Sequence, residues 1–136
     1  MEIIIIDDNS TILKLLELML KKEGFITLED KLSTYLSIDS IPNLTSINTV
    51  DIIICDYDLG KTSINGLDFF KKIIDDEFIN ECVLLTGDDT FELRKKLTEM
   101  PSIHYVIKSA NNDKSSTVNQ LGKIINTIRE SKNVSK

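Results

Sequence analysis

The 136-residue sequence contains no tryptophan, two prolines, two cysteines and one histidine. It has no apolar run near the roughly 18 to 20 residues that a membrane-spanning helix requires. Its first apolar run, Ile3–Ile6, is short and flanked by acids, which argues against a signal peptide. A single histidine cannot build a zinc site, and Cys55 and Cys82 lie in apolar runs typical of buried free thiols in a reducing compartment. Together these absences predict a cytoplasmic protein.

Acidic residues outnumber basic ones, and the formal net charge is -6. Contacts with phosphate groups need a basic face, so this balance argues against nucleic acid as the main partner. The hydrophobic content of 41% is enough for a core. The mean hydropathy of -0.04 is typical of neither a membrane protein nor a disordered chain. We find no linker, repeat or second domain, so the length favours a single domain.

Five short apolar runs predict β-strands. They cover Ile3–Ile6, Phe25–Leu28, Ile52–Cys55, Cys82–Leu85 and Ile103–Ile107. Apolar residues at helical spacing predict helices around residues 12–20, 67–74, 91–100 and 118–128. Residues 31–49 suggest only a short helix, which Pro42 and many polar residues interrupt.

Strands that alternate with helices predict βαβ crossovers, and hence an α/β fold with a doubly wound, five-stranded parallel sheet and helices on both faces. We expect residues 1–130 to form this domain. Residues 131–136 are polar, and we expect them to be a frayed tail.

Polar residues directly follow four of the predicted strands. They are Asp7 and Asp8, Asp56 and Asp58, Thr86, and Lys108. Ligands of open α/β sheets bind at the carboxyl ends of the strands, so these groups are expected to converge if their strands are neighbours. Clustered carboxylates repel one another, and a hard divalent cation such as Mg²⁺ relieves that repulsion. A lysine and a hydroxyl opposite them suit a phosphoryl group, and one carboxylate can act as the nucleophile.

This order of motifs resembles the receiver domain of two-component response regulators, over residues 3 to about 128. The resemblance rests on Asp7-Asp8, Asp56, Thr86 and the segment Tyr105–Lys108. It implies a flavodoxin-like strand order, 2-1-3-4-5. It also implies a signalling protein that is not a conventional enzyme, although it catalyses its own aspartyl phosphorylation and dephosphorylation.

The resemblance implies that Asp56 is the phosphoacceptor and takes its phosphoryl group from a phosphohistidine. The donor would be a histidine kinase or a histidine phosphotransfer protein. The implied cofactor is Mg²⁺, or Mn²⁺, with Asp56 and Asp8 as direct ligands and Asp7 acting mostly through water. The backbone carbonyl of Asp58 would be a further metal ligand.

The remaining roles concern switching. The resemblance implies that Lys108 pairs with the phosphoryl oxygens, that Thr86 moves to hydrogen-bond them, and that Tyr105 swings inward behind Thr86. This shift would reshape a face built from the helix at 91–100, the strand at 103–107 and the helix at 118–128. That face would bind a downstream protein or a second copy of the chain. We expect a stand-alone receiver, or a receiver that belongs to a larger hybrid kinase, with no direct contact to nucleic acid and no membrane insertion.

Three departures from the family pattern surround the site. Ser109 stands where a proline usually follows the lysine, so we expect a trans or strained Lys108–Ser109 peptide bond, because a cis bond there costs roughly 3–4 kcal/mol. The loop after Asp56 lacks a usual proline and is about two residues longer before Gly66. Asp58 adds an acid, which we expect to alter the lifetime of the phosphate.

Three other interpretations compete with the receiver. A calcium loop of EF-hand type fails, because Lys61 and Leu67 occupy the positions that need glycine and glutamate. Haloacid dehalogenase phosphatases also place Asp-x-Asp after a strand, but they carry it on their first strand and their extra acids late in the chain. A degenerate receiver that only binds partners, independently of phosphorylation, remains the third alternative.

Overall fold

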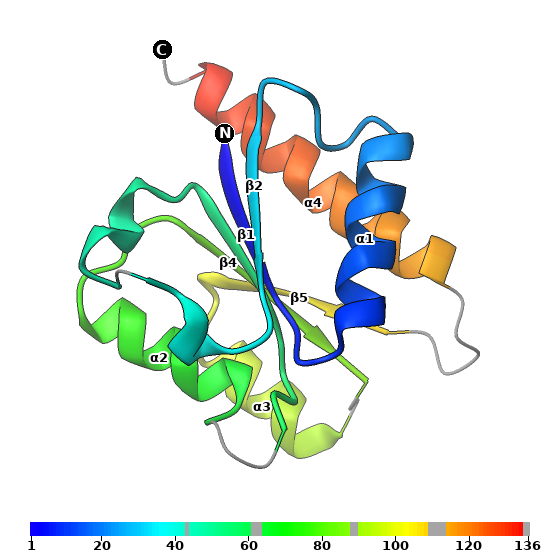
Figure 1. Ribbon diagram of the computed structural model, residues 1–136. Coiled ribbons are helices and arrows are strands. Elements are labelled where there is room, and N and C mark those ends of the chain that lie inside the picture. The colour runs from blue at the N-terminus through cyan, green and yellow to red at the C-terminus, as the bar shows by residue number, and fades with distance from the viewer. Residues whose placement is uncertain (43, 61–63, 88–89, 109–113, 135–136) are drawn as a thin grey trace.

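The computed structural model describes residues 1–42, 44–60, 64–87, 90–108 and 114–134 (Figure 1). Five parallel strands form one sheet in the order β2-β1-β3-β4-β5. The strands are β1 (Glu2–Ile6), β2 (Lys31–Tyr35), β3 (Ile52–Asp56), β4 (Glu81–Thr86) and β5 (Ile103–Ile107). The α-helices are α1 (Ser10–Lys22), α2 (Gly66–Asp75), α3 (Phe91–Thr98) and α4 (Lys114–Val134). This confirms the predicted fold class and strand order.

Helices cover both faces of the sheet, with α1 and α4 on one face and α2 and α3 on the other (Figure 1). The side chains of the central strands alternate between two buried clusters. Ile53 and Cys55 of β3 pack with α2 and α3, whereas Ile52 and Ile54 pack with α1 and α4. A strand buried on both faces must be apolar throughout, which explains the uninterrupted runs in β1, β3 and β4.

Helices begin close to the carboxyl ends of the strands because polar residues cap them there. Asn9 accepts hydrogen bonds from the backbone of Thr11 and Ile12 at the start of α1. Asn65 accepts one from Asp68 at the start of α2. Such caps satisfy backbone N–H groups that have no partner within the helix. They therefore fix where each strand-to-helix loop turns, and these loops carry the candidate site.

The prediction of a strand at Phe25–Leu28 was wrong, because β2 begins at Lys31. Phe25 is apolar for another reason: its ring lies where a side chain on Gly122 of α4 would have to sit. Asp30 then holds a turn by accepting a hydrogen bond from Thr27 N. The true β2 is an edge strand of mixed polarity, Lys-Leu-Ser-Thr-Tyr, so it lacks the apolar run of a central strand.

The described part of the segment between β2 and β3 contains no α-helix, so the short helix suggested there was also wrong. Two 3₁₀ segments, η1 (Ile38–Ser40) and η2 (Leu44–Thr49), occupy it instead. Residues 131–134, expected to be frayed, are helical, because α4 continues to Val134. Lys132 anchors that part of α4 through a 3.0 Å ion pair with Asp51. Among the described residues, no helix combines the length and the apolar character needed to cross a bilayer.

Candidate functional site

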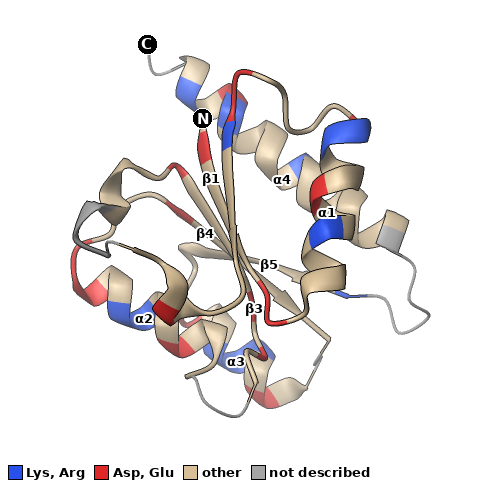
Figure 2. Cartoon of the chain, in the orientation of Figure 1, with Lys and Arg blue, Asp and Glu red and all other residues tan. Residues whose placement is uncertain are grey.

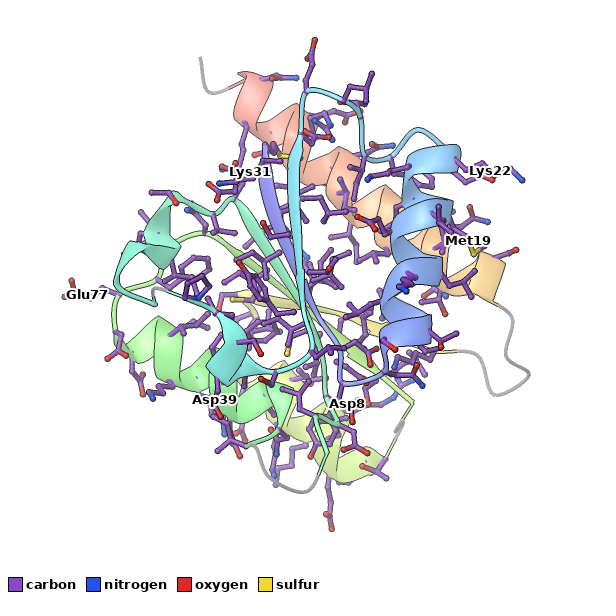
Figure 3. The ribbon with its side chains drawn as sticks, viewed as in Figure 1. Asp8, Met19, Lys22, Lys31, Asp39 and Glu77 are labelled. Atoms are coloured by element: carbon purple, nitrogen blue, oxygen red, sulfur yellow. The ribbon has the colours of Figure 1, made fainter. Side chains whose placement is uncertain are left out.

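The parallel sheet brings the predicted site residues to one edge. Asp7 and Asp8 follow β1, Asp56 ends β3, Thr86 ends β4, and Lys108 follows β5. Acidic segments mark the carboxyl ends of β1 and β3 (Figure 2). Asp8 lies at this edge, and Lys31 lies at the opposite end of the sheet (Figure 3).

Three carboxylates form the centre of the site. Asp7, Asp8 and Asp56 each offer an oxygen, and these oxygens lie within 4.8 Å of one another. Asp7 is 2% exposed and Asp56 is 8% exposed, whereas Asp8 faces solvent. Asp7 Oδ1 accepts a hydrogen bond of 2.9 Å from Asn9 N. Asp7 Oδ2 is buried and has no hydrogen-bond partner among the described residues.

Lys108 is the cation of this cluster. Its Nζ donates a hydrogen bond of 2.9 Å to Asp56 Oδ1 and lies 3.9 Å from Asp7 Oδ2. The backbone N–H of Lys108 donates to the carbonyl of Thr86 at 2.7 Å. The sheet register thus continues one residue past β5 and fixes the base of the lysine side chain beside β4.

One lysine does not neutralise the cluster. The pKa of Asp7 is raised from 3.8 to about 6, because burial and the negative charges of Asp56 and Asp8 outweigh the hydrogen bond from Asn9 and the charge of Lys108. Burial also raises the pKa of Asp56, against the hydrogen bond and charge of Lys108. A buried carboxylate oxygen that accepts no hydrogen bond from the described residues, beside two more carboxylates, is an arrangement that a hard divalent cation satisfies. The residues present therefore fit Mg²⁺ or Mn²⁺.

The loop after β3 presses two glycines against the site. An added Cβ on Gly66 would overlap the backbone carbonyl oxygen of Asp56. Gly60 has φ +87°, and a Cβ there would lie 3.2 Å from Asp8 Oδ2. Gly66 N also donates to the carbonyl of Tyr57 at 2.8 Å, and Tyr57 N donates to Leu85 O at 2.7 Å. The backbone on which Asp56 stands is therefore held from two directions.

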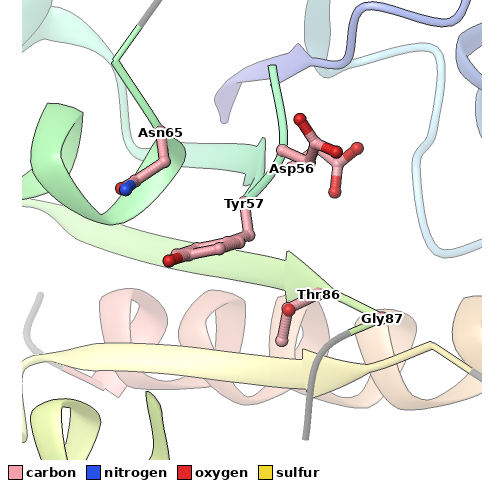
Figure 4. A pocket seen from close by; sticks show the side chains of 6 residues that line it. Asp56, Tyr57, Asn65, Thr86 and Gly87 are labelled. Carbon is pink, nitrogen blue, oxygen red and sulfur yellow. The ribbon is translucent and has the colours of Figure 1, made fainter. Parts of the chain in front are cut away.

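A pocket of about 370 Å³ opens beside Asp56 (Figure 4). It is lined by Asp56, Tyr57, Asp58, Asn65, Thr86 and Gly87. Sequence reasoning did not single out Tyr57 or Asn65 as lining residues. The signal available was their position, since one lies between the two aspartates and the other directly precedes Gly66.

The other predicted residues take different places. Asp58 lines the pocket, but its carboxylate is exposed and accepts a hydrogen bond of 3.1 Å from Gly60 N, outside the three-carboxylate cluster. Thr86 is buried, and Tyr105 is 41% exposed on β5. The expectations for the Lys108–Ser109 bond and for the longer loop fall on residues 109 and 61–63, outside the described residues.

The fold and the acidic site at its carboxyl edge define the class: a flavodoxin-like α/β protein with a carboxylate–lysine centre. Residues 3–118 match the sequence model of the response regulator receiver domain. The chain belongs to this family, which is the receiver domain of two-component systems.

Solved structures agree with this assignment at the level of the fold. A response regulator receiver domain protein from Clostridium thermocellum has a TM-score of 0.74 and 21% identity, covering 99% of this chain and 98% of that one. The non-phosphorylated HemR receiver domain from Leptospira biflexa has a TM-score of 0.71 and 18% identity, with coverage of 91% and 93%. Response regulator protein TrrA from Thermotoga maritima, in complex with Mg(2+)-BeF, has a TM-score of 0.67 and 23% identity, with coverage of 93% and 97%. No curated protein matches the sequence.

Proposed function

We propose that Asp56 accepts a phosphoryl group from the phosphohistidine of a histidine kinase or histidine phosphotransfer protein. The observation that carries this proposal is the Lys108–Asp56 pair of 2.9 Å inside a carboxylate cluster with a buried oxygen that accepts no hydrogen bond from any described residue. The acceptor is a residue of the protein itself, so the chain is a signalling component and not a conventional enzyme. We propose residues 1–130 as the receiver unit.

The transfer would be a displacement at phosphorus. An oxygen of Asp56 attacks, the bond between phosphorus and the donor imidazole nitrogen breaks, and an acyl phosphate forms. Lys108 already lies at Asp56 Oδ1, so its ammonium can move to the phosphoryl oxygens and offset their added charge. Thr86 lines the same pocket and offers a hydroxyl to those oxygens.

Asp8 and Asp56, with the backbone carbonyl of Asp58, would hold Mg²⁺ or Mn²⁺ directly, and Asp7 would hold it mostly through water. The ion would supply positive charge that offsets the carboxylates and the developing charge on the phosphoryl group. The support in this chain is the raised pKa of Asp7 and its buried oxygen, which accepts no hydrogen bond from the described residues. The Thermotoga maritima structure was obtained in complex with Mg(2+)-BeF.

Phosphorylation would then change a protein-binding face. Thr86 would turn toward the phosphoryl group and Tyr105 would move inward, which alters the surface of α3, β5 and α4. We propose that this surface binds a downstream protein or a second copy of the chain. The 41% exposure of Tyr105 supports the proposal, because the side chain starts from an outward position.

Intact-mass spectrometry tests the proposed acceptor. Incubation with Mg²⁺ and acetyl phosphate should add one phosphoryl mass to the wild type and none to Asp56→Asn. Asp39→Asn is the matched control, because Asp39 is an exposed acid of η1 outside the cluster. A mass gain that survives in Asp56→Asn, or no gain in the wild type with any phosphohistidine donor, contradicts the proposal.

Asp58 would tune how long the phosphate lasts. Its carboxylate lines the pocket beside Asp56, where it can orient water or alter metal affinity. The substitution Asp58→Asn retains both the backbone carbonyl and an oxygen that can accept from Gly60 N. We expect it to change the dephosphorylation rate. An unchanged rate with unchanged Mg²⁺ dependence leaves Asp58 as a turn residue only.

A further inference from the structure

Tyr57 lies directly beside the proposed phosphoacceptor and contributes its ring to the wall of the pocket (Figure 4). The backbone of Tyr57 is fixed by hydrogen bonds to Leu85 O and from Gly66 N. The ring is only partly buried and packs against the core cluster beneath α2 and α3. The main chain at Tyr57 is therefore held while its side chain borders open space.

Tyr105 lies on β5, on the other side of β4 from the strand that Tyr57 follows. The strand order places β3 and β5 on opposite sides of β4. Tyr105 is paired in register with Leu84, and Thr86 lies two residues further along β4. Side chains two residues apart on a strand, and those paired across neighbouring strands, lie on one face of the sheet. Leu84, Thr86 and Tyr105 therefore share the face that α2 and α3 cover.

We propose that Tyr57 is a positioning residue that competes with Tyr105 for the space above Thr86. The pocket is bordered by the Tyr57 ring, while the Tyr105 ring is 41% exposed one strand away. A rotation about χ1 carries a strand aromatic between its staggered positions, and burial of the ring favours the inward position when space permits. The volume left by Tyr57 thus determines how much of the population holds Tyr105 inward.

This inference rests on the proposed switch and adds a residue that sets its threshold. A smaller side chain at position 57 should let Tyr105 enter the pocket without phosphorylation. A larger one should hold Tyr105 outward even after Asp56 is phosphorylated. Tyr57→Phe keeps the ring and removes only the hydroxyl, so it should behave as the wild type if ring volume is the cause.

Fluorine NMR of the full chain tests the competition. The sequence has three tyrosines, so 3-fluorotyrosine labelling gives three resonances that Tyr→Phe variants assign. The readout is the broadening of the Tyr105 resonance by a soluble gadolinium chelate, without any phosphodonor. We expect Tyr57→Leu to reduce this broadening by about twofold, and Tyr57→Phe to leave it unchanged. Tyr35→Leu is the control, because Tyr35 packs against the same core cluster but lines a different groove.

A Tyr105 signal in Tyr57→Leu that is as broad as in the wild type overturns the inference, as does an equal change in Tyr35→Leu. If Tyr57→Leu fails to fold, Tyr57→Trp decides. After treatment with acetyl phosphate and Mg²⁺, Tyr105 should stay accessible to the chelate in Tyr57→Trp and become protected in the wild type. Equal protection in both overturns the inference. The mass of the same samples reports Asp56 phosphorylation, so a failure of the proposed function is seen separately.

Discussion

Lys108 and Asp56 are 52 residues apart in sequence, yet Lys108 Nζ lies 2.9 Å from Asp56 Oδ1. A second aspartate–lysine pair lies at the other end of β3, where Lys132 Nζ is 3.0 Å from Oδ1 of Asp51, the residue directly before the strand. Only the first pair belongs to the carboxylate cluster. Substitution of Lys108 removes an ion pair at the site, and substitution of Lys132 removes a similar ion pair away from the site. The two lysines can therefore be compared as a test and its control.

Removal of the lysine charge at the site should impair phosphorylation. In Lys108→Gln the pKa of Asp56 rises further, because burial and the neighbouring carboxylates still act while the charge that lowered it is gone. The carboxylate of Asp56 then loses its proton only at higher pH, so the pH at which the initial rate rises is shifted to a higher value. We expect the rate at pH 7 to fall by roughly tenfold or more. Mass spectrometry at timed intervals measures it, and Lys132→Gln should retain the wild-type profile.

Asp7 should make the metal-free protein less stable at neutral pH. Its pKa is raised from 3.8 to about 6, so between these values the folded state binds more protons than the unfolded state. The free energy of unfolding therefore falls as the pH rises through this window. Asp7→Asn removes the buried charge and keeps an oxygen that can accept from Asn9 N. In EDTA at pH 7 it should be more stable than the wild type by about 2 kcal/mol.

Urea denaturation at several pH values checks this prediction. The difference between Asp7→Asn and the wild type should shrink as the pH falls from 6 and vanish below about pH 3, where the wild-type carboxyl is protonated in both the folded and the unfolded state. Added Mg²⁺ should stabilise the wild type more than the variant. Asp39→Asn, which changes an exposed acid, should match the wild type throughout. A variant that is less stable than the wild type at pH 7 in EDTA would contradict the electrostatic account.

The sequence predicted the central strands and the site because both leave local signals. A strand buried on both faces has to be apolar, as in β3, and the first polar residue after it marks the ligand edge of the sheet. The edge strand β2 leaves no such signal. Phe25 gave a false strand signal, because its apolar ring packs against Gly122 of α4 and does not belong to a strand. The spacing of apolar residues along the sequence cannot reveal a contact between two residues as far apart in the chain as Phe25 and Gly122.

Tyr57 illustrates a second limit. Its residue type is compatible with core, surface or site, and only the three-dimensional pocket separates these possibilities. The same holds for Asp58, whose sequence position beside Asp56 suggested a pair. In the structure the two carboxylates have different partners. The carboxylate of Asp58 accepts a hydrogen bond from Gly60 N, and that of Asp56 accepts one from Lys108 Nζ.

Gly66 should be intolerant of a side chain. An added Cβ would overlap the carbonyl oxygen of Asp56 and lie 3.1 Å from Leu84 Cδ1. The backbone of β3 cannot give way easily, because β1 and β4 hold it on both sides. We expect Gly66→Ala to lower the free energy of unfolding by about 2 kcal/mol and to slow phosphorylation of Asp56.

Gly87→Ala is the matched control for that change. A Cβ at Gly87 would meet no heavy atom within 4 Å, so its stability should stay within about 0.5 kcal/mol of the wild type. Denaturant titration of both variants gives the comparison. Equal stability of Gly66→Ala and Gly87→Ala would show that the loop after β3 adapts without cost.

Asp30 should be the acid whose loss costs stability most clearly at the end of the sheet opposite the site. Its carboxylate accepts from both terminal nitrogens of Arg129, at 2.9 and 2.8 Å, and pairs with the Met1 ammonium at 2.9 Å. The hydrogen bonds from Arg129 hold the pKa of Asp30 well below its usual range. Asp30→Asn leaves the partly buried guanidinium without its counter-charge, so we expect a loss of about 3 kcal/mol at pH 7.

The pH dependence of that loss identifies its cause. An acid with a depressed folded-state pKa stabilises the protein above its unfolded-state pKa, and this contribution is lost as the pH falls toward the folded-state value. The difference between the wild type and Asp30→Asn should therefore shrink below about pH 4. Glu17→Gln is the control, because Glu17 forms only a 3.4 Å surface pair with Lys21, worth about 0.5 kcal/mol. A loss for Asp30→Asn that is equal at pH 3 and pH 7 would mean that packing, and not charge, holds α4 against the turn before β2.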